Sequence, residues 1–515
     1  MAGRKTHAQR LRILDDRSIK SVIIVGGGTA GWMAAAVLSK AFAKLSITLI
    51  ESEEIGIVGV GEATIPQIRH INAFLGLDED EFLRATQGTF KLGIQFNGWT
   101  RPGDSYIHAF GDIGLQVSLA PFHHYWLRAR KAGSGDTIWD YSINAAAAAK
   151  NRFARIDRVG SSRMAGVKHA FHFDASLYAG FLRGKSEARG VKRVEGKIVD
   201  VRQHAQTGFI EAVTLESGAT VAGDLFIDCS GFRGLIIEQA LKAGFEDWSH
   251  WLPCDRAVVA PCRHGDAIRP YTQATARKAG WQWRIPLQHR VGNGHVYSSG
   301  FLSDEEARAI LLANLEGEIL ADPKIIGFAT GMRRRHWVKN CVAIGLASGF
   351  MEPLESTSIH LIQSGLARLV SMFPDRRFDE TLIAEFNRQA RFEFESIRDF
   401  LILHYHANRR DDCEFWTHCR SMRIPDGLAA KMSLFGSSAR IFREHEELFS
   451  ETGWLQVLIG QGVFPEAGHP MADEMDDAQL KQMLSDMKTL IAREVDAMPD
   501  HRSYVMANCA ATERN

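Results

Sequence analysis

The sequence lacks the features that would place the chain in a membrane or in an oxidising compartment. No apolar run reaches the ~18 residues that a membrane-spanning helix needs. The basic stretch before residue 20 has no apolar core, which argues against a secretory signal, and residues 1–18 are expected to form a solvated tail. The seven cysteines are odd in number and form no C-x-x-C pair, so neither a disulfide framework nor a metal site is expected. We therefore expect a reducing, cytoplasmic location.

The chain also has no formal net charge and no low-complexity segment. The 61 Lys and Arg residues balance 61 Asp and Glu residues, so electrostatics gives no argument for a nucleic-acid partner or an anionic membrane. What is present is ordinary globular composition, with 45% hydrophobic and 24% charged residues. Because 515 residues exceed the usual size of one hydrophobic core, the chain is expected to contain more than one domain.

A glycine-rich turn directly follows an apolar, β-branched run at residues 22–31. In this pattern Gly26 makes the tight turn, Gly28 lets backbone amides approach a pyrophosphate, and Gly31 lets the next helix pack closely on the strand. Glu51 ends a second apolar strand about 20 residues later, where an acid suits ribose hydroxyls. The alternative is a tight structural turn between a strand and a helix. The order of strand, glycines, helix, strand and acid predicts dinucleotide binding.

Two further segments can reach the same ligand. The glycine-rich loop 56–66 contains Glu62 and can approach a flat cofactor without side-chain clashes, although it could equally be a structural bulge. The apolar run 223–231 ends in Asp228 and a turn of small residues, which indicates a buried strand whose C-terminal end lies near the site. Two nucleotide-contacting segments so far apart in sequence are more typical of FAD enzymes than of NAD dehydrogenases.

Several residues could carry chemistry or line a pocket. The run 90–96 alternates like a strand and carries Lys91, a residue type that more often lies on a solvated face. The strand-like run 106–111 places His108 and Phe110 on one face, as a pocket wall or as core. Trp281 and Trp283, at positions i and i+2 of one strand, would form a rigid flat wall.

Glu355 stands at or just before a helix start, followed by three hydroxyl residues. That pattern suits ordinary helix capping, and it also suits free backbone amides that bind an anion.

Taken together, these motifs resemble the flavin-dependent tryptophan halogenases and their indole-halogenating relatives. The W-x-W-x-I-P motif distinguishes that family from flavin monooxygenases that share the nucleotide fold. The resemblance covers residues 20 to about 420 and rests on Gly26-Gly-Gly-Thr-Ala-Gly-Trp32, Gly59-Val-Gly-Glu-Ala-Thr-Ile-Pro66, Lys91, Trp281-x-Trp-x-Ile-Pro286, Glu352-Pro-Leu-Glu355-Ser-Thr and Ile397-Arg-Asp-Phe-Leu-Ile-Leu-His-Tyr405.

The resemblance implies an α/β fold. We expect an FAD-binding, Rossmann-like box domain of the three-layer GR2 type over residues 19–377, and a mainly helical substrate-side domain over residues 378–515. A homodimer is compatible with the sequence. The expected cofactor-binding residues are Gly26, Gly28, Thr29, Ala30, Gly31, Glu51, Gly59, Glu62, Ala63, Asp228, Gly345 and Leu354.

The family chemistry uses reduced FAD (FADH2), O₂ and chloride or bromide to form hypohalous acid, which then halogenates an aromatic substrate. The resemblance makes Lys91 the residue that holds or captures the halogen and Glu355 the one that stabilises the arenium cation and accepts its proton. Thr357 and Ser358 would bind the halide. With a single nucleotide fingerprint in the sequence, a separate NAD(P)H-dependent flavin reductase is the expected partner. The expected substrate pocket comprises His108, Phe110, Trp281, Trp283, Ile285, Pro286 and Trp454.

The sequence departs from the family near its C-terminus. Tryptophan-specific members carry a tyrosine pair and a glutamate that hold the amino acid, and residues 440–454 contain no tyrosine. We therefore expect indole, or a larger indole derivative, to be preferred over free tryptophan. Two other functions fit the nucleotide fingerprint, namely a flavin-dependent aromatic monooxygenase and a non-catalytic flavin-binding protein. A monooxygenase function does not explain why Lys91, Glu355 and the tryptophan motif occur together.

Overall fold

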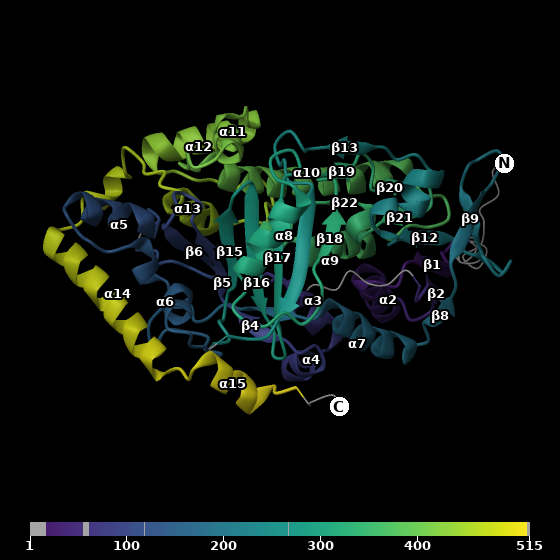
Figure 1. Cartoon of the computed structure of the whole chain (residues 1–515), viewed down its shortest axis with the longest axis horizontal. Helices are drawn as coiled ribbons and strands as arrows, with labels where there is room; N and C mark the ends of the chain where they lie inside the picture. The colour runs from purple at the N-terminus through teal and green to yellow at the C-terminus, as the bar shows by residue number, and fades with distance from the viewer. Residues whose placement is uncertain (1–16, 55–60, 118, 266, 512–515) are drawn as a thin grey trace, which may run out of the picture.

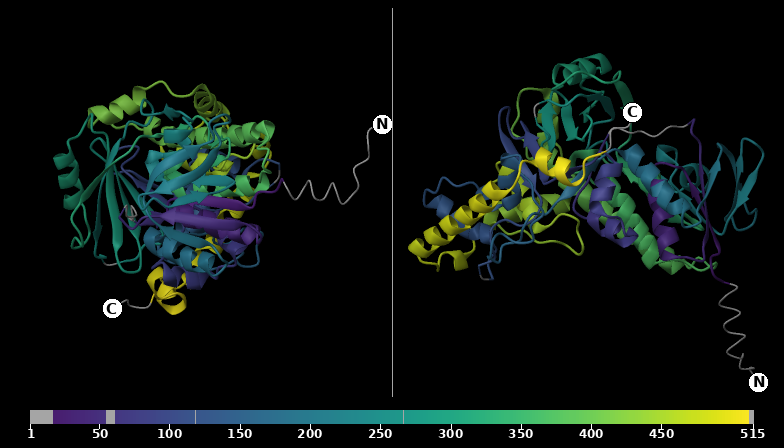
Figure 2. Two further views of the ribbon diagram at one scale, coloured as in Figure 1. Left: turned by 90° about the vertical axis from the view of Figure 1, so that its right-hand side faces the viewer. Right: turned by 90° about the horizontal axis from the view of Figure 1, so that it is seen from below.

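The structure, a computed structural model, describes residues 17–54, 61–117, 119–265 and 267–511 (Figure 1). A six-stranded, mostly parallel sheet and a seven-stranded sheet dominate it. The six-stranded sheet lies at one end of the molecule, α14 (Asp477–Ala497) at the other, and the seven-stranded sheet between them (Figures 1 and 2).

The six-stranded sheet carries the nucleotide fingerprint and confirms the predicted strand–helix–strand unit. Strand β1 (Ser21–Val25) has a parallel neighbour on each side, and all its residues after Ser21 are buried, as expected of a central parallel strand. In spatial order the strands are β20 (Trp337–Val338), β21 (Cys341–Ala343), β12 (Leu225–Asp228), β1 (Ser21–Val25), β2 (Ser46–Glu51) and β8 (Lys192–Glu195).

Alternate residues of β1 belong to two different hydrophobic cores. Val22 and Ile24 share one core with the helices α2 (Thr29–Ala41), α7 (Ala175–Glu187) and α9 (Ser358–Ser371). Ile23 and Val25 share the other with the three-stranded sheet formed by β9 (Ile198–Gln203), β10 (Ile210–Leu215) and β11 (Thr220–Ala222). Helices, parallel sheet and small sheet thus form three layers, and the expected three-layer α/β fold is confirmed.

The seven-stranded sheet is antiparallel except for one parallel pair, β5 with β15. It holds the tryptophan motif on β16, a central strand in which every residue except Arg284 is buried. In spatial order its strands are β18 (Lys324–Gly327), β14 (Arg256–Cys262), β17 (Val291–Tyr297), β16 (Gly280–Pro286), β15 (Thr272–Arg277), β5 (Gly93–Asn97) and β6 (Ser105–Ala109).

The predicted strand 90–96 is divided between two sheets. Thr89–Lys91 forms β4, which pairs with β7 (Ala170–Phe173) and through it with β3 (Glu62–Ala63), whereas β5 begins only at Gly93. β5 pairs with β6 from Gly93 onward, and a Cβ at Gly93 would lie 2.5 Å from the His108 carbonyl oxygen, so the close approach of β6 requires glycine there. The chain thus changes sheets between Lys91 and Gly93, and Lys91 lies at the junction of the two sheets. The strand predicted over 106–111 likewise ends at Ala109.

The C-terminal part is mainly helical, as expected, and α10 is its longest described helix. The proposed domain boundary at residue 377 stays a prediction. A further small sheet joins β13 (Phe245–Asp247), β19 (Gly331–Arg333) and β22 (Gly349–Phe350). The remaining described helices are α3 (Ile68–Leu75), α4 (Glu79–Ala85), α5 (Phe122–Lys131), α6 (Ile143–Ala149), α8 (Asp304–Ala313), α10 (Glu380–His406), α11 (Glu414–Ser421), α12 (Asp426–Ser438), α13 (Glu451–Gly460) and α15 (His501–Asn508).

Candidate active site

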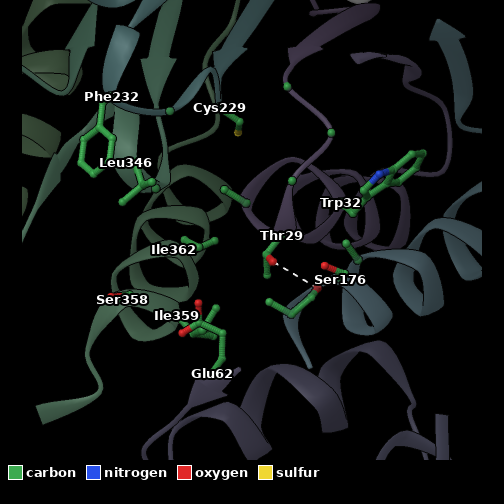
Figure 3. A pocket seen from close by; sticks show the side chains of 18 of the residues that line it. Thr29, Trp32, Glu62, Ser176, Cys229, Phe232, Leu346, Ser358, Ile359 and Ile362 are labelled. Atoms are coloured by element: carbon green, nitrogen blue, oxygen red, sulfur yellow. Dashed lines mark hydrogen bonds between the residues drawn. The ribbon is translucent and has the colours of Figure 1, made fainter. Parts of the chain in front are cut away.

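A cavity of about 750 Å³ opens where the carboxyl ends of the parallel strands meet the N-terminus of α2 (Figure 3). Thr29 stands at the start of that helix and Ser358 at the start of α9, on opposite walls of the cavity in Figure 3. Ligands of open α/β sheets bind at this edge. The predicted cofactor residues that line it are Gly26, Gly28, Thr29, Ala30, Glu51, Glu62, Ala63 and Gly345.

Three other predicted cofactor residues do not line this cavity. A Cβ at Gly31 would lie 1.8 Å from the Gly26 carbonyl oxygen, so Gly31 serves the close packing of helix on strand. The buried Asp228 carboxylate accepts hydrogen bonds from the backbone amides of Ser230, Ile236 and Ile237, and its contact with the cofactor stays a prediction. Leu354 is buried and does not line the cavity, so its contact with the cofactor stays a prediction, and Gly59 lies outside the described residues.

The lining of the cavity suits a dinucleotide. No side chain caps the N-terminus of α2, so its first backbone amides are available to a pyrophosphate. Glu51 ends β2, where it accepts a hydrogen bond from the indole of Trp32 (3.3 Å) and pairs with Arg193. Burial raises the pKa of Glu62 to about 7, and the nearby Asp174 carboxylate adds to the shift. FAD therefore fits the residues present.

Lys91 lies fully buried beside this cavity. Its Nζ donates to the carbonyl oxygen of Thr64 (2.9 Å) and to Ser356 Oγ (2.7 Å), and it lies 5.3 Å from the centre of the Phe110 ring. Burial lowers the pKa of Lys91 to about 7, although the charge of Glu355 opposes that shift. The lysine thus links the second glycine-rich loop to the turn that carries Glu355, and both its protonation states are accessible near neutral pH.

Glu355 is an ionised carboxylate in a dry site. His108 Nδ1 donates to it at 2.9 Å, and His404 Nε2 lies 2.9 Å from Oε1, an ion-pair distance without the alignment of a hydrogen bond. Burial would raise the pKa of Glu355, but the two imidazoles outweigh burial and bring it to about 2. His404 lies within the family segment 397–405 but is not among the predicted site residues, because the helical pattern alone does not distinguish it from a core histidine of α10.

The turn that contains Glu355 lies at the edge of the cofactor cavity. Ser356 and Ser358 line the 750 Å³ cavity, whereas Lys91 and Glu355 do not. Ser356 has φ +59°, a left-handed conformation that costs a side-chain-bearing residue about 1–2 kcal/mol. Thr357 is buried, and its Oγ1 has no partner among the described residues. The turn therefore lies between the cavity, which Ser356 and Ser358 line, and the Glu355 carboxylate, which does not line it.

Aromatic side chains surround the far side of Glu355. Phe449 stacks on Phe400 with ring centres 3.8 Å apart, and Trp454 meets Phe400 edge-on at 4.9 Å. The His108 ring lies 5.7 Å from that of Phe400. His108 and Trp454 are thus brought together as predicted pocket residues. Phe400 and Phe449 were not predicted, because no motif marks Phe449.

The tryptophan motif faces more than one environment. Trp283 and Ile285 line the cofactor cavity. Trp281 lies behind them, its ring centre 6.1 Å from that of Trp283 and its Nε1 donating to Glu352 Oε2 (2.6 Å). The Pro286 carbonyl accepts from Thr89 Oγ1 (2.6 Å). Trp281 and Pro286 therefore do not line the cofactor cavity, and their place in the substrate pocket stays a prediction.

Neither a metal site nor a membrane span is evident in the part of the chain that the structure describes. There, no group of three or more His, Cys, Asp and Glu side chains could hold a metal ion. No helix within the same residues is long and apolar enough to cross a membrane.

The structure thus combines a cavity that suits a dinucleotide with a buried lysine and carboxylate that do not line it. The chain belongs to the tryptophan halogenase family, whose family model matches residues 21–477. It is a flavin-dependent halogenase.

Named relatives agree with this assignment. A flavin-dependent halogenase from Xanthomonas campestris, Xcc4156, shares 48% identity and superimposes with a TM-score of 0.94, covering 97% of this chain and 100% of that one. BrvH, a flavin-dependent halogenase from Brevundimonas sp. BAL3, shares 47% identity with a TM-score of 0.92 over 95% and 99% of the two chains. The tryptophan 6-halogenase ThaL of Streptomyces albogriseolus is 38% identical over 445 residues, 82% of each chain.

Proposed function

We propose that this halogenase uses FADH2, O₂ and chloride or bromide to halogenate an indole-type arene in preference to free tryptophan. The observation that carries the proposal is the arrangement at residues 355–356. Glu355 and Ser356 are neighbours, yet Ser356 lines the cofactor cavity and bonds to Lys91, while Glu355 turns toward His108 and the aromatic side chains.

The chain's own groups would hold the cofactor and the halide. The N-terminus of α2 would bind the pyrophosphate of FAD, and Glu51 would bind a ribose. Bound reduced FAD would supply, with O₂ and halide, the hypohalous acid. The halide would bind at the uncapped start of α9, near Thr357 and Ser358, where the helix dipole favours an anion. Electrons would come from a separate NAD(P)H-dependent flavin reductase.

The halogenation step then follows from the two buried side chains. Protonated Lys91 donates a hydrogen bond to the hypohalous oxygen, and the neutral amine can take the halogen as a haloamine. The arene attacks the halogen, so that a carbon–halogen bond forms while the halogen–oxygen bond breaks, and the departing oxygen takes the Lys91 proton and leaves as water. Glu355, ionised and already oriented by His108, stabilises the arenium cation and accepts its ring proton. The net change is replacement of one ring hydrogen by halogen.

The charges beside Trp454 support a neutral substrate. Lys431 Nζ lies 4.4 Å from the centre of the Trp454 ring and pairs with Glu447 at 2.7 Å, and both charged side chains are nearly buried. A zwitterionic amino acid would need an anion and a cation of its own, and each unpaired polar group would cost about 1–3 kcal/mol. Here the two candidate partners already neutralise each other. An indole ring needs only area and stacking.

A competition assay tests this substrate. Indole and tryptophan are offered in equal amounts with FAD, bromide, NADH and a generic flavin reductase, and the products are separated by mass. We expect indole to be converted first, at its electron-rich C3. Selective conversion of tryptophan at a benzenoid carbon would refute the substrate preference. Absence of any halogenated product from a panel of arenes would refute the proposed chemistry as a whole.

A further inference from the structure

Glu352 is a completely buried carboxyl group three residues before Glu355, and the mechanism above does not use it. Its Oε2 accepts hydrogen bonds from Trp281 Nε1 (2.6 Å) and from the Tyr405 hydroxyl (2.5 Å). Its Oε1 has no partner among the described residues. Because burying a carboxyl group is costly unless it is well bonded, this arrangement calls for a reason.

The position of Tyr405 suggests that reason. Tyr405 follows His404 on α10, and His404 is the residue that faces Glu355 at 2.9 Å. The His404 ring is itself fixed, because its Nδ1 donates to the Phe400 carbonyl oxygen (2.8 Å). Two successive residues of one helix therefore contact two carboxylates of one turn, His404 with Glu355 and Tyr405 with Glu352.

We propose that Glu352, Tyr405 and His404 are positioning residues that fix the Pro353–Glu355 turn so that Glu355 faces the arene. This inference rests on the proposed roles of Lys91 and Glu355. Trp281 completes the set, since its indole ties the turn to strand β16 while the two α10 side chains tie it to the helix.

The turn needs such support for a physical reason. Pro353–Glu355 is a single turn, and it runs directly into Ser356 with its left-handed backbone. A residue in that conformation relaxes unless its surroundings hold it. Misplacement of a reacting group by about 1 Å can cost about 10²-fold in rate. If the turn relaxed, hypohalous acid would still form in the cofactor cavity, but it would escape before Glu355 could assist its reaction.

The test compares Tyr405→Phe and Glu352→Gln with the wild-type holoenzyme, using indole and bromide with a flavin reductase. The quantity measured is the ratio of brominated indole to hypobromous acid trapped by a chromogenic scavenger. We expect this ratio to fall about tenfold or more in both variants, with NADH-driven oxidant formation unchanged. Tyr141→Phe is the matched control, since it removes another buried tyrosine hydroxyl that donates to a carboxylate, Asp136, at 2.7 Å.

The outcomes separate the possible explanations. If Tyr405→Phe lowers only the melting temperature and keeps the product ratio of Tyr141→Phe, the positioning role is refuted and the bond is merely structural. If the wild-type enzyme itself gives trapped oxidant but no brominated arene, the proposed chemistry at Lys91 and Glu355 has failed instead. An intact product ratio in Glu352→Gln, which keeps the shape of the side chain, would equally overturn the role of the carboxylate.

A second readout needs no cofactor. The titratable groups that interact with Glu352 are Tyr405 and the thiols of Cys254 and Cys419. Burial raises the pKa of Glu352 to about 7, while the bonds from Tyr405 and Trp281 hold it down. Infrared titration of the apoprotein should therefore show a carboxylic-acid C=O band that Glu352→Gln removes and that persists to higher pH in Tyr405→Phe. An unshifted band in Tyr405→Phe would show that the bond does not act on Glu352.

Discussion

Replacing Lys91 by methionine should abolish arene halogenation and, at the same time, stabilise the protein. Methionine has a similar length and no charge, and it fits a dry site without the desolvation that Lys91 suffers. Burial lowers the pKa of Lys91 from 10.5 to about 7, so the folded protein binds this proton far less readily than the unfolded chain does. At 1.36 kcal/mol per unit, keeping Lys91 protonated in the fold at acidic pH costs about 5 kcal/mol.

Part of the stabilisation of the Lys91→Met variant is lost because the hydrogen bonds of Lys91 are removed. Methionine cannot donate to Thr64 or Ser356, and each lost bond costs about 1 kcal/mol. The net stabilisation at pH 6 is therefore about 3 kcal/mol, or about 3 °C in melting temperature for a chain of 515 residues. Between about pH 7 and 10.5 the unfolded chain holds the proton and the folded protein does not, so wild-type stability rises with pH in that window. The advantage of the variant should fall to about zero by pH 9.

Thermal melts of the apoproteins between pH 6 and pH 9 measure this difference. Lys278→Met, at an exposed lysine that pairs with Glu306, is the control and should show no stabilisation that fades with rising pH. FAD affinity should be unchanged in Lys91→Met, because Lys91 does not line the cofactor cavity. The reasoning is refuted if Lys91→Met is less stable than wild type at pH 6, if the difference does not change with pH, or if the variant still halogenates indole.

Three further outcomes follow from the site. Glu355→Gln should slow halogenation about 10²-fold or more with FAD affinity unchanged, as measured by product formation and flavin titration, and a wild-type rate would remove Glu355 from the mechanism. The purified chain with FAD alone should not consume NADH at enzyme-like rates, since its sequence has one nucleotide fingerprint; rapid consumption would show a nicotinamide site. Gly26→Ala should lose FAD binding, because the residue has φ +109° and its Cβ would lie 2.3 Å from the Cys229 carbonyl oxygen, whereas Gly436→Ala, with open space around its Cβ, should bind normally.

The parts of the fold that the sequence predicts are those set by local pattern. The strand, turn and helix around Gly26 follow from apolar runs and glycines, and they lie where expected. The break after Lys91 could not be predicted in this way, because it depends on which strands the two halves pair with, β7 for Thr89–Lys91 and β6 from Gly93 onward. Periodicity alone gives one strand there, and only the tertiary contact divides it.

The candidate site shows the same limit. Lys91 and Glu355 are recognisable because each belongs to a family motif, yet nothing local indicates that Ser356 joins them. His404 and Phe449 reach Glu355 or its neighbours through helix packing across long sequence separations. Asp228 is predicted as a cofactor residue from its place at the end of a strand, and nothing local indicates that the backbone amides of Ile236 and Ile237 donate to it.

Helix α10 places a mechanical constraint on how this enzyme can move. Its 27 residues span about 40 Å. Near its start, Asn387 makes three hydrogen bonds with the backbone of His336 and Trp337 beside the parallel sheet. In its middle, Glu393 bonds to His360, Ser364 and Arg368 of α9. Near its end, His404 contacts Glu355. Because α10 is held at its start, middle and end, a displacement at one end is expected to move the other end as well. We therefore expect the parallel sheet, α9 and the Glu355 turn to keep their relative positions, and any opening that admits substrate to come from segments that this helix does not contact.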